Sequence, residues 1–584
     1  MVQRINLLGV WDYVVLGAVL VISAGIGVYY RFTGGKQKTV KEYLLADNNM
    51  HIAPVAFSLM ASFMSAITLL GVASENYTFG FQFIVINISY GIFTPVAAYL
   101  YLPVFFQLQA TSVYEYLEKR FGQFARLSAS VCYSLQMVLY MGIVLYAPAL
   151  ALEALTGITQ LAAILTVGLV CTFYSTLGGM KAVLMTDLFQ SILMFGAVFS
   201  IIICAFVQTG SIADIWRIAE EGNRTSLLNF DIDPTVRHSW FSLIIGGGVT
   251  FLSLYAVNQT QVQRYLTVKD LKKAQQALWL NWPILTALSL CTSFSGLAIY
   301  SKYYNCDPVS NNSITSTDQL MPYYVIDSMG HIPGISGFFV AGIFSGTLST
   351  VSAAMNCLAA VTLEDYFKPL YYRIKGYELS DKRLSIRTKI ISFIYGLVCI
   401  AIAFLAQFLG GVLQAALTIF GVVGGPLLGL FSLGMFTRTA NEQGAVTGLV
   451  TGLAFSIWIA FGGPRPPLPK LPVRVDGCSS TRYLHNISVP LLHSRTDDTD
   501  YFWLYRVSYL YNGVLGLICT LVVGIVVSIL CNKLCGTMAK NTDPNLFVPF
   551  IAKRMRKRLK RDKIEISDGV FMNNKSSSNK SQSC

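Results

Sequence analysis

Long apolar runs alternate with short polar segments along almost the whole chain. Each run comes close to, or exceeds, the roughly 20 residues that an α-helix needs to cross a bilayer. The pattern predicts an all-α polytopic membrane protein. Its thirteen transmembrane helices are expected at 10–30, 51–73, 80–106, 124–150, 158–177, 183–207, 240–258, 276–300, 334–361, 388–409, 413–436, 443–461 and 507–531.

The ninth run carries no charge, yet five hydroxyl side chains fall within eight positions: Ser345, Thr347, Ser349, Thr350 and Ser352. On a helix, Ser345, Ser349 and Ser352 share one face. Such hydroxyls can bond the backbone one turn back or a neighbouring helix, in which case they only pack. They can also supply oxygen ligands to a dehydrated hard cation. This run alone leaves both interpretations open.

Two runs contain features typical of interrupted helices. The second has small polar residues in mid-membrane, from Ser58 to Ser65, and the seventh contains the glycine triplet 246–248. Transporters built from inverted repeats place interrupted helices at corresponding positions of their two halves, with the binding site between them. We therefore predict a single transporter domain, 1–535, composed of an extra helix at 10–30, repeats at 51–207 and 240–436, and two last helices within 443–531.

The interruption in the second run indicates a cation site. A helix that breaks between Ala61 and Met64 frees carbonyl groups, which need partners inside a membrane. A cation bound by the carbonyls of Ala61, Met64 and Gly346 and by the hydroxyls of Ser349 and Thr350 would satisfy both helices at once.

A lone carboxylate, Asp187, begins the sixth run, where it needs a partner or a cavity. It either pairs with Lys181 near the inner surface or places a negative charge beside a bound cation. Lys and Arg are absent from the core runs near the expected site. An anionic substrate would therefore rely on helix N-termini and on polar side chains such as Gln259.

Composition narrows the functional classes. Hydrophobic residues make up 54% of the 584 residues and charged residues only 12%, against roughly 25% in soluble domains. The sequence contains no P-loop, GxSxG or HExxH motif, so we expect neither an enzyme nor a nucleotide-driven pump, and no cofactor. The net charge is +13, and 32 of the 43 Lys and Arg fall in segments that lie inside if the N-terminus is outside. This asymmetry predicts an outer N-terminus and a cytoplasmic C-terminus.

The predicted outer loops hold candidate modification sites. Three glycosylation acceptors fall there, at Asn223, Asn311 and Asn486. Cys306 and Cys478 lie in two different outer loops, an oxidising setting, and we expect them to form a disulfide.

The C-terminal tail, 536–584, is basic, and we expect it to be cytoplasmic and largely disordered. Its charge can simply solvate the inner face, or it can attract anionic lipid of the inner leaflet. Nucleic acid is not an expected partner beside thirteen membrane spans.

Six short motifs are similar to those of one family. They lie at 61–65 (ASFMS), 115–122 (EYLEKRFG), 174–182 (YSTLGGMKA), 258–265 (NQTQVQRY), 345–350 (SGTLST) and 424–429 (GGPLLG). Over about residues 10–535 the chain resembles the solute:sodium symporters, in particular the animal branch of sodium-coupled monocarboxylate, multivitamin and iodide transporters.

This resemblance implies a leucine-transporter-like fold with alternating access. It implies a sodium site made of Ala61, Met64, Gly346, Ser349 and Thr350. In members that couple two ions, a residue that matches Asp187 helps to build the second site, with Gln190 nearby. Substrate-facing positions would include Phe63, Thr68, Tyr140, Phe251 and Gln259. The sugar-carrying branch has Asn and His where this chain has Phe63 and Thr68, and Glu at Val85, which argues against a sugar.

Residues and resemblance together predict a plasma-membrane symporter that couples Na⁺ to the uptake of a small organic anion, a monocarboxylate or a vitamin-like carboxylate. An iodide-like anion is an open alternative. A solute sensor or a sodium leak channel on the same scaffold is the rival from another class.

Overall fold

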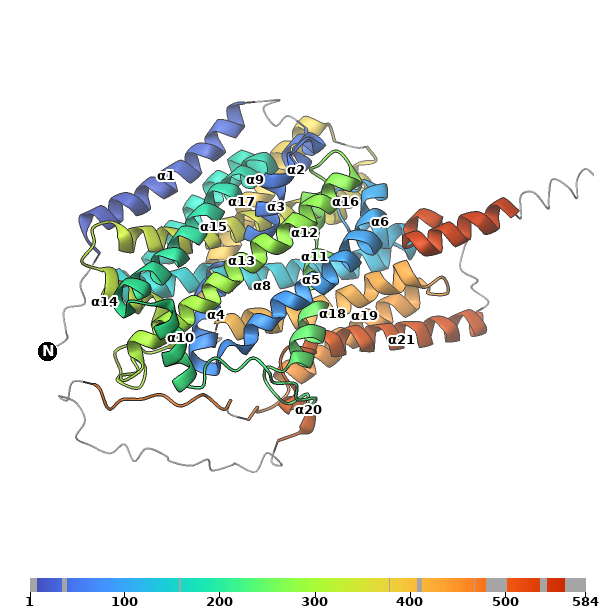
Figure 1. The fold of residues 1–584 in the computed structure, drawn as a ribbon. Coiled ribbons are helices and arrows are strands. Elements are labelled where there is room, and N and C mark those ends of the chain that lie inside the picture. Colours follow the sequence, from blue (N-terminus) through green and yellow to red (C-terminus); the bar gives the residue numbers. More distant parts are fainter. Residues whose placement is uncertain are drawn as a thin grey trace, which may run out of the picture.

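The computed structural model describes residues 8–33, 39–156, 159–377, 379–406, 412–466, 468–478, 501–535 and 543–561. Helices form nearly all of this part, packed side by side in one bundle (Figure 1). The longer ones are α1 (Val10–Phe32), α3 (Ile52–Ala61), α4 (Ala66–Phe79), α5 (Ile86–Val96), α8 (Gln123–Thr156), α9 (Gln160–Thr209), α11 (Gly247–Tyr255), α13 (Leu271–Tyr303), α15 (Ile335–Val361), α17 (Asp381–Ala406), α18 (Val412–Phe436), α19 (Glu442–Phe461) and α21 (Tyr511–Cys535). The shorter ones are α2 (Val40–Leu45), α6 (Leu102–Leu108), α7 (Glu115–Arg120), α10 (Ile212–Glu221), α12 (Gln259–Tyr265), α14 (Leu320–Met329), α16 (Lys368–Lys375) and α20 (Trp503–Arg506).

Ten helices within the described residues are long and apolar enough to cross a membrane, or up to twelve if each of two bent pairs forms one span. The predicted fifth and sixth spans are two helices that follow each other without a loop and together form α9; they meet at a kink at Gly179, whose φ of 61° and ψ of −171° are not helical. At 1.5 Å per residue their 50 residues have a combined length of about 75 Å, enough for two passes through the roughly 30 Å hydrocarbon core. The number thirteen and the orientation of the termini stay predictions.

The two bent pairs lie where the two predicted repeats begin. Helices α3 and α4 meet at 58°, and the stretch Ser242–Tyr255 meets α12 at 59°. The first break, at Ser62–Ser65, lies where the sequence predicts it. The second does not, because the glycine triplet lies inside a continuous helical stretch and the chain breaks after Tyr255. The triplet instead permits close packing, since a Cβ on Gly248 would lie 2.1 Å from the Phe93 ring.

Helix α15 forms the centre of the bundle. Every residue from 339 to 361 is buried, and the helix contacts α1, α3, α4, α8, α9 and α17. A long, mostly apolar helix without a charged side chain is expected to be buried against protein or lipid, and here protein surrounds it. Helix α1 lies along one flank (Figure 1), where the Asp12 carboxylate accepts a 2.9 Å hydrogen bond from the Gly337 amide near the start of α15.

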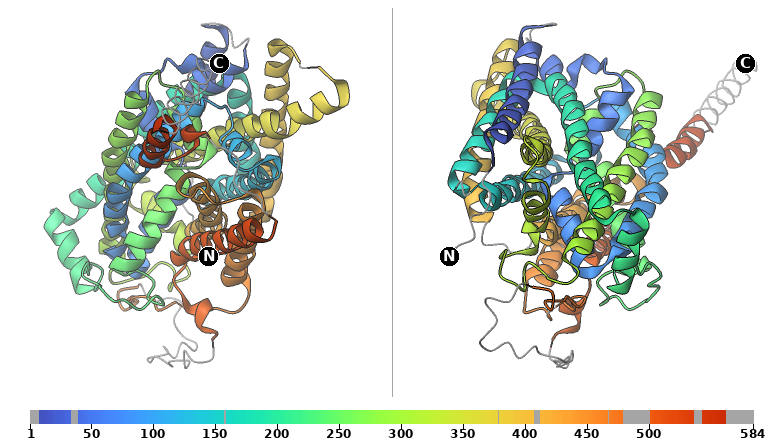
Figure 2. Two further views of the ribbon diagram at one scale, coloured as in Figure 1. Left: turned by 90° about the vertical axis from the view of Figure 1, so that its right-hand side faces the viewer. Right: turned by 60° about the vertical axis from the view of Figure 1, so that its left-hand side comes forward.

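Part of the C-terminal tail is ordered, which its composition does not predict. A 3₁₀ turn at Pro544–Leu546 is followed by a helix at 549–561, the tail helix. Figure 1 and the right-hand view of Figure 2 show the tail helix leading away from the bundle. The Ser/Asn/Lys-rich end, 573–584, lies outside the described residues.

Candidate functional site

The break between α3 and α4 frees backbone groups in the middle of the bundle. The last carbonyls of a helix lack part of their hydrogen bonds within it. Those of Ser58 and Met60 still accept from amides of the break itself, whereas those of Leu59 and Ala61 meet other helices. The Ser62 amide donates to the Ser58 carbonyl at 3.0 Å. The side-chain amide of Gln261, on α12, donates to the Leu59 carbonyl at 2.9 Å. The Ala61 carbonyl faces the Thr350 hydroxyl of α15 at 3.4 Å. The two broken helices therefore support each other across the site.

A glycine on α15 permits the close approach of that helix to the break. A Cβ on Gly346 would lie 2.9 Å from the Ala66 nitrogen and 3.5 Å from the Met64 carbonyl oxygen. The Thr350 hydroxyl also bonds the Gly346 carbonyl, at 3.0 Å. The structure thus brings together four of the five oxygens that the sequence predicts for a cation, the carbonyls of Ala61, Met64 and Gly346 and the Thr350 hydroxyl, whereas the Ser349 hydroxyl donates to the Asp187 carboxylate. These four are neutral oxygens, which is the donor chemistry that a hard cation prefers.

Asp187 lies beside these oxygens and is fully buried. Its carboxylate accepts a 2.6 Å hydrogen bond from the Ser349 hydroxyl and a second from the Ser58 hydroxyl. Of the two alternatives for Asp187, pairing with Lys181 does not hold, because Lys181 is exposed and its ammonium lies 5.9 Å from the Tyr30 ring centroid. Asp187 therefore links α3, α9 and α15 inside the bundle and does not pair with a basic residue near the predicted inner surface.

A buried arginine completes this cluster. The Arg264 guanidinium lies 3.3 Å from the Asp187 carboxylate and donates to the Ser58 hydroxyl at 2.7 Å and to the Thr260 carbonyl at 2.9 Å. Both charged side chains have no exposed surface. The expectation that Lys and Arg are absent near the site is therefore wrong. The sequence places Arg264 in an inner loop, but it lies on α12, the second half of the broken seventh span.

Gln190 lies one turn after Asp187 on α9 and points toward α1. Its amide nitrogen is 3.5 Å from the Ser23 hydroxyl, and its carbonyl oxygen is buried without a hydrogen-bond partner in the described part of the chain. One acceptor oxygen thus remains available next to the Asp187 cluster.

A cavity of about 90 Å³ adjoins the break. Four of the five predicted substrate-facing residues line it: Phe63, Thr68, Tyr140 and Phe251. Its remaining wall is largely aromatic and aliphatic, with hydroxyls but no charged side chain: Met64, Ser65, Ile67, Val72, Phe83, Ile86, Tyr90, Thr250, Leu254, Tyr255, Leu285, Ser289, Leu413, Ala416, Leu417 and Phe420. The Tyr140 hydroxyl lies 3.5 Å from that of Ser65, the residue that precedes α4.

The fifth predicted residue, Gln259, does not line the cavity, which corrects the expectation from sequence. Its amide nitrogen donates to the Thr111 carbonyl at 2.7 Å, and its oxygen accepts from the Val113 amide at 2.8 Å. Gln259 therefore ties α12 to the segment between α6 and α7, and it has no free group for a solute.

Known proteins are similar to this chain in sequence and in fold. The model of the sodium:solute symporter family matches residues 43–452. The chain belongs to the sodium:solute symporter family. It is 54% identical to a Drosophila melanogaster protein with the provisional name sodium-dependent multivitamin transporter, over 94% of this chain and 93% of that one. It is 46% identical to the human sodium-coupled monocarboxylate transporter 1, over 92% and 89% of the two chains.

A solved structure of a Na⁺-coupled sialic acid symporter, in a substrate-bound outward-open state, has the same fold. The TM-score is 0.73 at 23% identity, and the match covers 89% of this chain and 98% of that one. The chain is thus a multi-pass membrane transporter with a leucine-transporter-like fold, it is not an enzyme, and Na⁺ is the coupling ion of its family.

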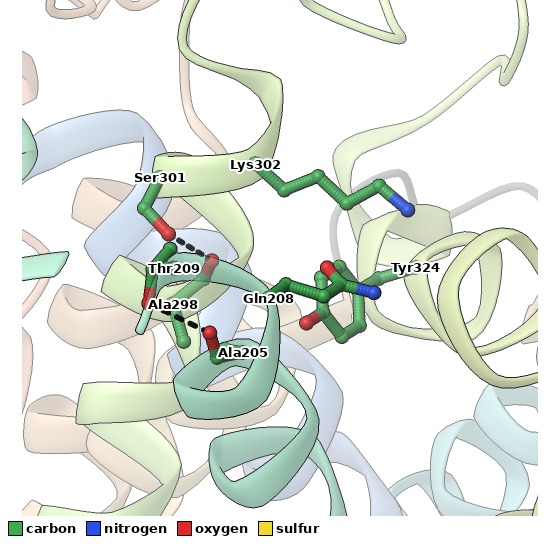
Figure 3. Close-up of a pocket in the computed structure, with 7 residues that line it drawn as sticks. All are labelled: Ala205, Gln208, Thr209, Ala298, Ser301, Lys302 and Tyr324. Carbon is green, nitrogen blue, oxygen red and sulfur yellow. Dashed lines mark hydrogen bonds between the residues drawn. The ribbon is translucent and has the colours of Figure 1, made fainter. Parts of the chain in front are cut away.

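The symporter has a second cavity, of about 250 Å³, away from the break. It lies between the C-terminal ends of α9 and α13 and the middle of α14, and it is lined by Ala205, Gln208, Thr209, Ala298, Ser301, Lys302 and Tyr324. In the view of Figure 3 the side chains of Gln208 and Tyr324 overlap, and the Lys302 side chain extends above them. The Lys302 ammonium is already engaged, 2.6 Å from the Asp327 carboxylate. None of the predicted site residues lines this cavity.

The predicted outer loops of the symporter are tied together by a strap, residues 471–478. A disulfide joins Cys306 to Cys478, whose Cα atoms are 5.0 Å apart. The Leu471 amide donates to the Thr78 carbonyl at 3.1 Å, at the end of α4. The buried Arg224 guanidinium donates to the carbonyls of Tyr77 and Pro472, at 3.2 and 2.7 Å. The strap therefore holds the end of α4 against its neighbours.

The predicted glycosylation acceptors differ in their surroundings. Asn223 is exposed with a φ of 59°. Asn311 is half-buried, and its amide nitrogen lies 3.6 Å from the Cys306 sulfur. Asn486 lies outside the described residues. Glycosylation at these positions stays a prediction.

Proposed function

We propose that this protein is a plasma-membrane symporter that uses the sodium gradient to carry a small organic anion into the cell by alternating access. In this proposal Na⁺ binds between the α3–α4 break and α15, held by the Ala61, Met64 and Gly346 carbonyls and the Ser349 and Thr350 hydroxyls. The observation that carries the proposal is the approach of Thr350 and Gly346 to the freed carbonyls of the break.

The cavity supports a small, weakly hydrated solute. Its aromatic wall offers apolar contact, and its hydroxyls can fix an orientation. The N-terminus of α4 lies at the edge of the cavity, because Ser65 and Thr68 both line it. A helix N-terminus carries a partial positive charge, which favours an anion where no charged side chain is present. The relatives named for monocarboxylates and vitamins agree with a carboxylate. With Phe63 and Thr68 at these positions, the cavity lacks the amide and imidazole side chains that the sugar-carrying branch has there, which argues against a sugar as the substrate.

The solute gradient that the protein can sustain depends on how many sodium ions it carries with each anion. A tenfold sodium gradient supplies about 1.4 kcal/mol per ion, and a potential of about −60 mV adds roughly 1.4 kcal/mol per charge. One ion with one monoanion is electroneutral and can sustain about a tenfold gradient. Two ions with one monoanion gain about 4.2 kcal/mol, on the order of a thousandfold, and produce an inward current.

A second sodium ion would bind Asp187, with Gln190 nearby. Asp187 is already neutralised by Arg264, 3.3 Å away, so a second ion must compete with the guanidinium for the carboxylate. Binding of that ion would therefore loosen the contact between α9 and α12. The Gln190 carbonyl oxygen, which lacks a partner in the described residues, supports this location.

A substrate panel in oocytes tests the proposal. Uptake of lactate, nicotinate, biotin and iodide is recorded with membrane current, in sodium and in choline. The proposal expects sodium-dependent accumulation of a carboxylate against its gradient. Sodium current without accumulation favours a leak channel, and solute binding without uptake favours a sensor. Accumulation of iodide alone would move the substrate to the iodide-like class.

One pair of variants tests the sodium site itself. Thr350→Ala removes the hydroxyl that faces the Ala61 carbonyl. Ser352→Ala, two positions further, removes an equally buried hydroxyl whose partners are the Ser349 carbonyl and Tyr174, not the carbonyls of the break. We expect Thr350→Ala to raise the sodium concentration for half-maximal uptake at least tenfold and Ser352→Ala to leave it within twofold. Equal values for both variants would remove Thr350 from the site.

A further inference from the structure

The most unexpected ordered segment is the C-terminal tail, which has two parts. Residues 546–548 form an anchor that is buried in the body of the protein. Leu546, Phe547 and Val548 are 5%, 2% and 0% exposed. The tail helix, 549–561, follows directly and leads away from the bundle (Figure 1). The anchor therefore fixes the position at which the tail helix begins.

The anchor completes the end of α18. The last carbonyls of α18 lack partners within the helix. The Val548 amide donates to the Met435 carbonyl at 3.2 Å. Arg120, on α7, donates to the Gly434 carbonyl at 3.0 Å, and its guanidinium lies 5.1 Å from the Phe547 ring centroid. The Tyr116 hydroxyl donates to the Leu546 carbonyl at 3.0 Å. Tail, α7 and α18 thus share one set of contacts.

The anchor is also connected to the candidate substrate cavity. Helix α18 runs from the anchor to Leu413, Ala416, Leu417 and Phe420, which line that cavity. A shift of the tail helix can therefore reach the cavity through a single helix.

The tail helix is strongly amphipathic. Ile551, Ala552, Met555 and Leu559 recur at the spacing of one helix face. Ala552 and Met555 are buried against the body, whereas Leu559 is 45% exposed. The remaining faces hold seven exposed basic side chains and no acidic one: Lys553, Arg554, Arg556, Lys557, Arg558, Lys560 and Arg561. Seven like charges on thirteen residues repel one another, so a nearby anionic surface would stabilise the helix.

We propose that the tail helix binds anionic phospholipid headgroups of the cytoplasmic leaflet, and that the anchor passes this binding on to α18. The tail lies close to a bilayer, because the helix starts fourteen residues after Cys535, the last residue of α21, at the same end of the bundle as the end of α18. Clusters of four to eight basic residues directly after a membrane span, or on an amphipathic helix, are typical of anionic-lipid binding. Leu559 and the half-exposed Phe550 add apolar side chains that can enter the headgroup boundary. This proposal rests on the proposed orientation, which places the tail in the cytoplasm.

Hydrogen exchange of the full-length protein tests the binding independently of transport. The protein is placed in nanodiscs of phosphatidylcholine, with or without phosphatidylserine, and exchange of the amides in 550–561 is followed by mass spectrometry. We expect exchange at least tenfold slower in the anionic nanodiscs, with the difference lost at high salt, because screening weakens exposed charges. Equal exchange in both lipids overturns the proposal, as does protection by an added acidic soluble protein but not by lipid.

Two matched variants distinguish a specific effect of the tail helix from a general effect of removing positive charge. The tail variant carries K553Q, R554Q, K557Q and K560Q. The control variant removes four exposed basic residues elsewhere on the predicted inner side, with R373Q, K375Q, K382Q and R383Q. We expect only the tail variant to lose the lipid-dependent protection. Protection that survives in the tail variant overturns the proposal.

Uptake into proteoliposomes tests the connection to α18. We expect the maximal sodium-dependent uptake rate of the unaltered protein to change at least twofold on adding phosphatidylserine, and that of the tail variant to stay constant. Lipid-dependent exchange without any lipid dependence of uptake would overturn the transmission to α18. A chain that carries no solute at all would still show the lipid-dependent exchange, so failure of the proposed function is distinguishable.

Discussion

Removal of the Arg264 guanidinium is the sharpest perturbation that the site offers. At 3.3 Å from Asp187, and with an effective dielectric constant of about 20, the two charges attract each other with about 5 kcal/mol. Arg264→Ala leaves the carboxylate buried without a counter-charge, which costs about 3–5 kcal/mol in comparable buried pairs. Asp187→Asn leaves the opposite charge unpaired and should cost a similar amount.

The double variant distinguishes a charge pair from two independent losses. Arg264→Ala with Asp187→Asn removes both charges, so no unpaired charge remains. We expect its melting temperature to be higher than that of either single variant. The assay is a fluorescence-detected thermal melt of the purified protein in detergent. A double variant whose loss equals the sum of the two single losses would refute the idea that the two side chains neutralise each other.

Sodium adds a second test of the same pair. If Na⁺ competes with Arg264 for Asp187, the Arg264→Ala variant should gain stability on transfer from choline to sodium. At a concentration tenfold above its dissociation constant, an ion that binds only the folded state stabilises it by about 1.4 kcal/mol. The double variant has no carboxylate there and should not gain at this site. The same sodium effect in both variants would place the ion elsewhere.

Three further predictions concern other parts of the molecule. Gly346→Ala places a methyl group 2.9 Å from an amide nitrogen of α4, so the sodium concentration for half-maximal uptake should rise on the order of tenfold; Gly25→Ala, with open space around it, is the control in the same uptake assay. Burial and the guanidinium of the preceding residue hold the pKa of His238 well below its usual range, so it is neutral when folded and takes up a proton below about pH 6.5 only when unfolded. The melting temperature should therefore fall from about pH 7 to pH 5, less steeply in His238→Gln, and equal slopes would contradict this. Replacing Cys306 and Cys478 by Ser should lower the free energy of unfolding by about 2–5 kcal/mol, which thermal melts can detect. The unaltered protein should reach the melting temperature of the variant only when a reductant is added.

The α3–α4 break could be predicted from the sequence because small polar residues interrupt an apolar run in mid-membrane. The cation site followed from the break, since carbonyls freed inside a membrane need partners. The convergence of Gly346 and Thr350 on this break follows the predicted pattern. The second break was placed in the wrong position. Gly246–Gly248 suggested it, but those glycines serve close helix contacts.

Arg264 was missed for a related reason. The polar run around it has the composition of a loop, and hydropathy cannot distinguish a loop from a short buried helix. One signal was present, because Asn258 caps α12 by accepting a hydrogen bond from the Thr260 amide at 2.9 Å, as a helix start requires. The tail anchor had a similar signal, the apolar triplet 546–548 inside a basic segment. Which partner such side chains meet depends on packing over several hundred residues, and no local pattern contains it.

The strap at 471–478 changes how the second span can move. Because Leu471 and Arg224 hold the last turn of α4, and Cys478 is bonded to Cys306, this half-helix cannot tilt without carrying the loop with it. If α4 rocks, it must therefore pivot at residues 62–65. The strap and Arg224, which are bonded to the other end of α4, must move with it. We expect an antibody fragment that clamps this loop, on the predicted outer side, to arrest the transport cycle while leaving the solute cavity untouched.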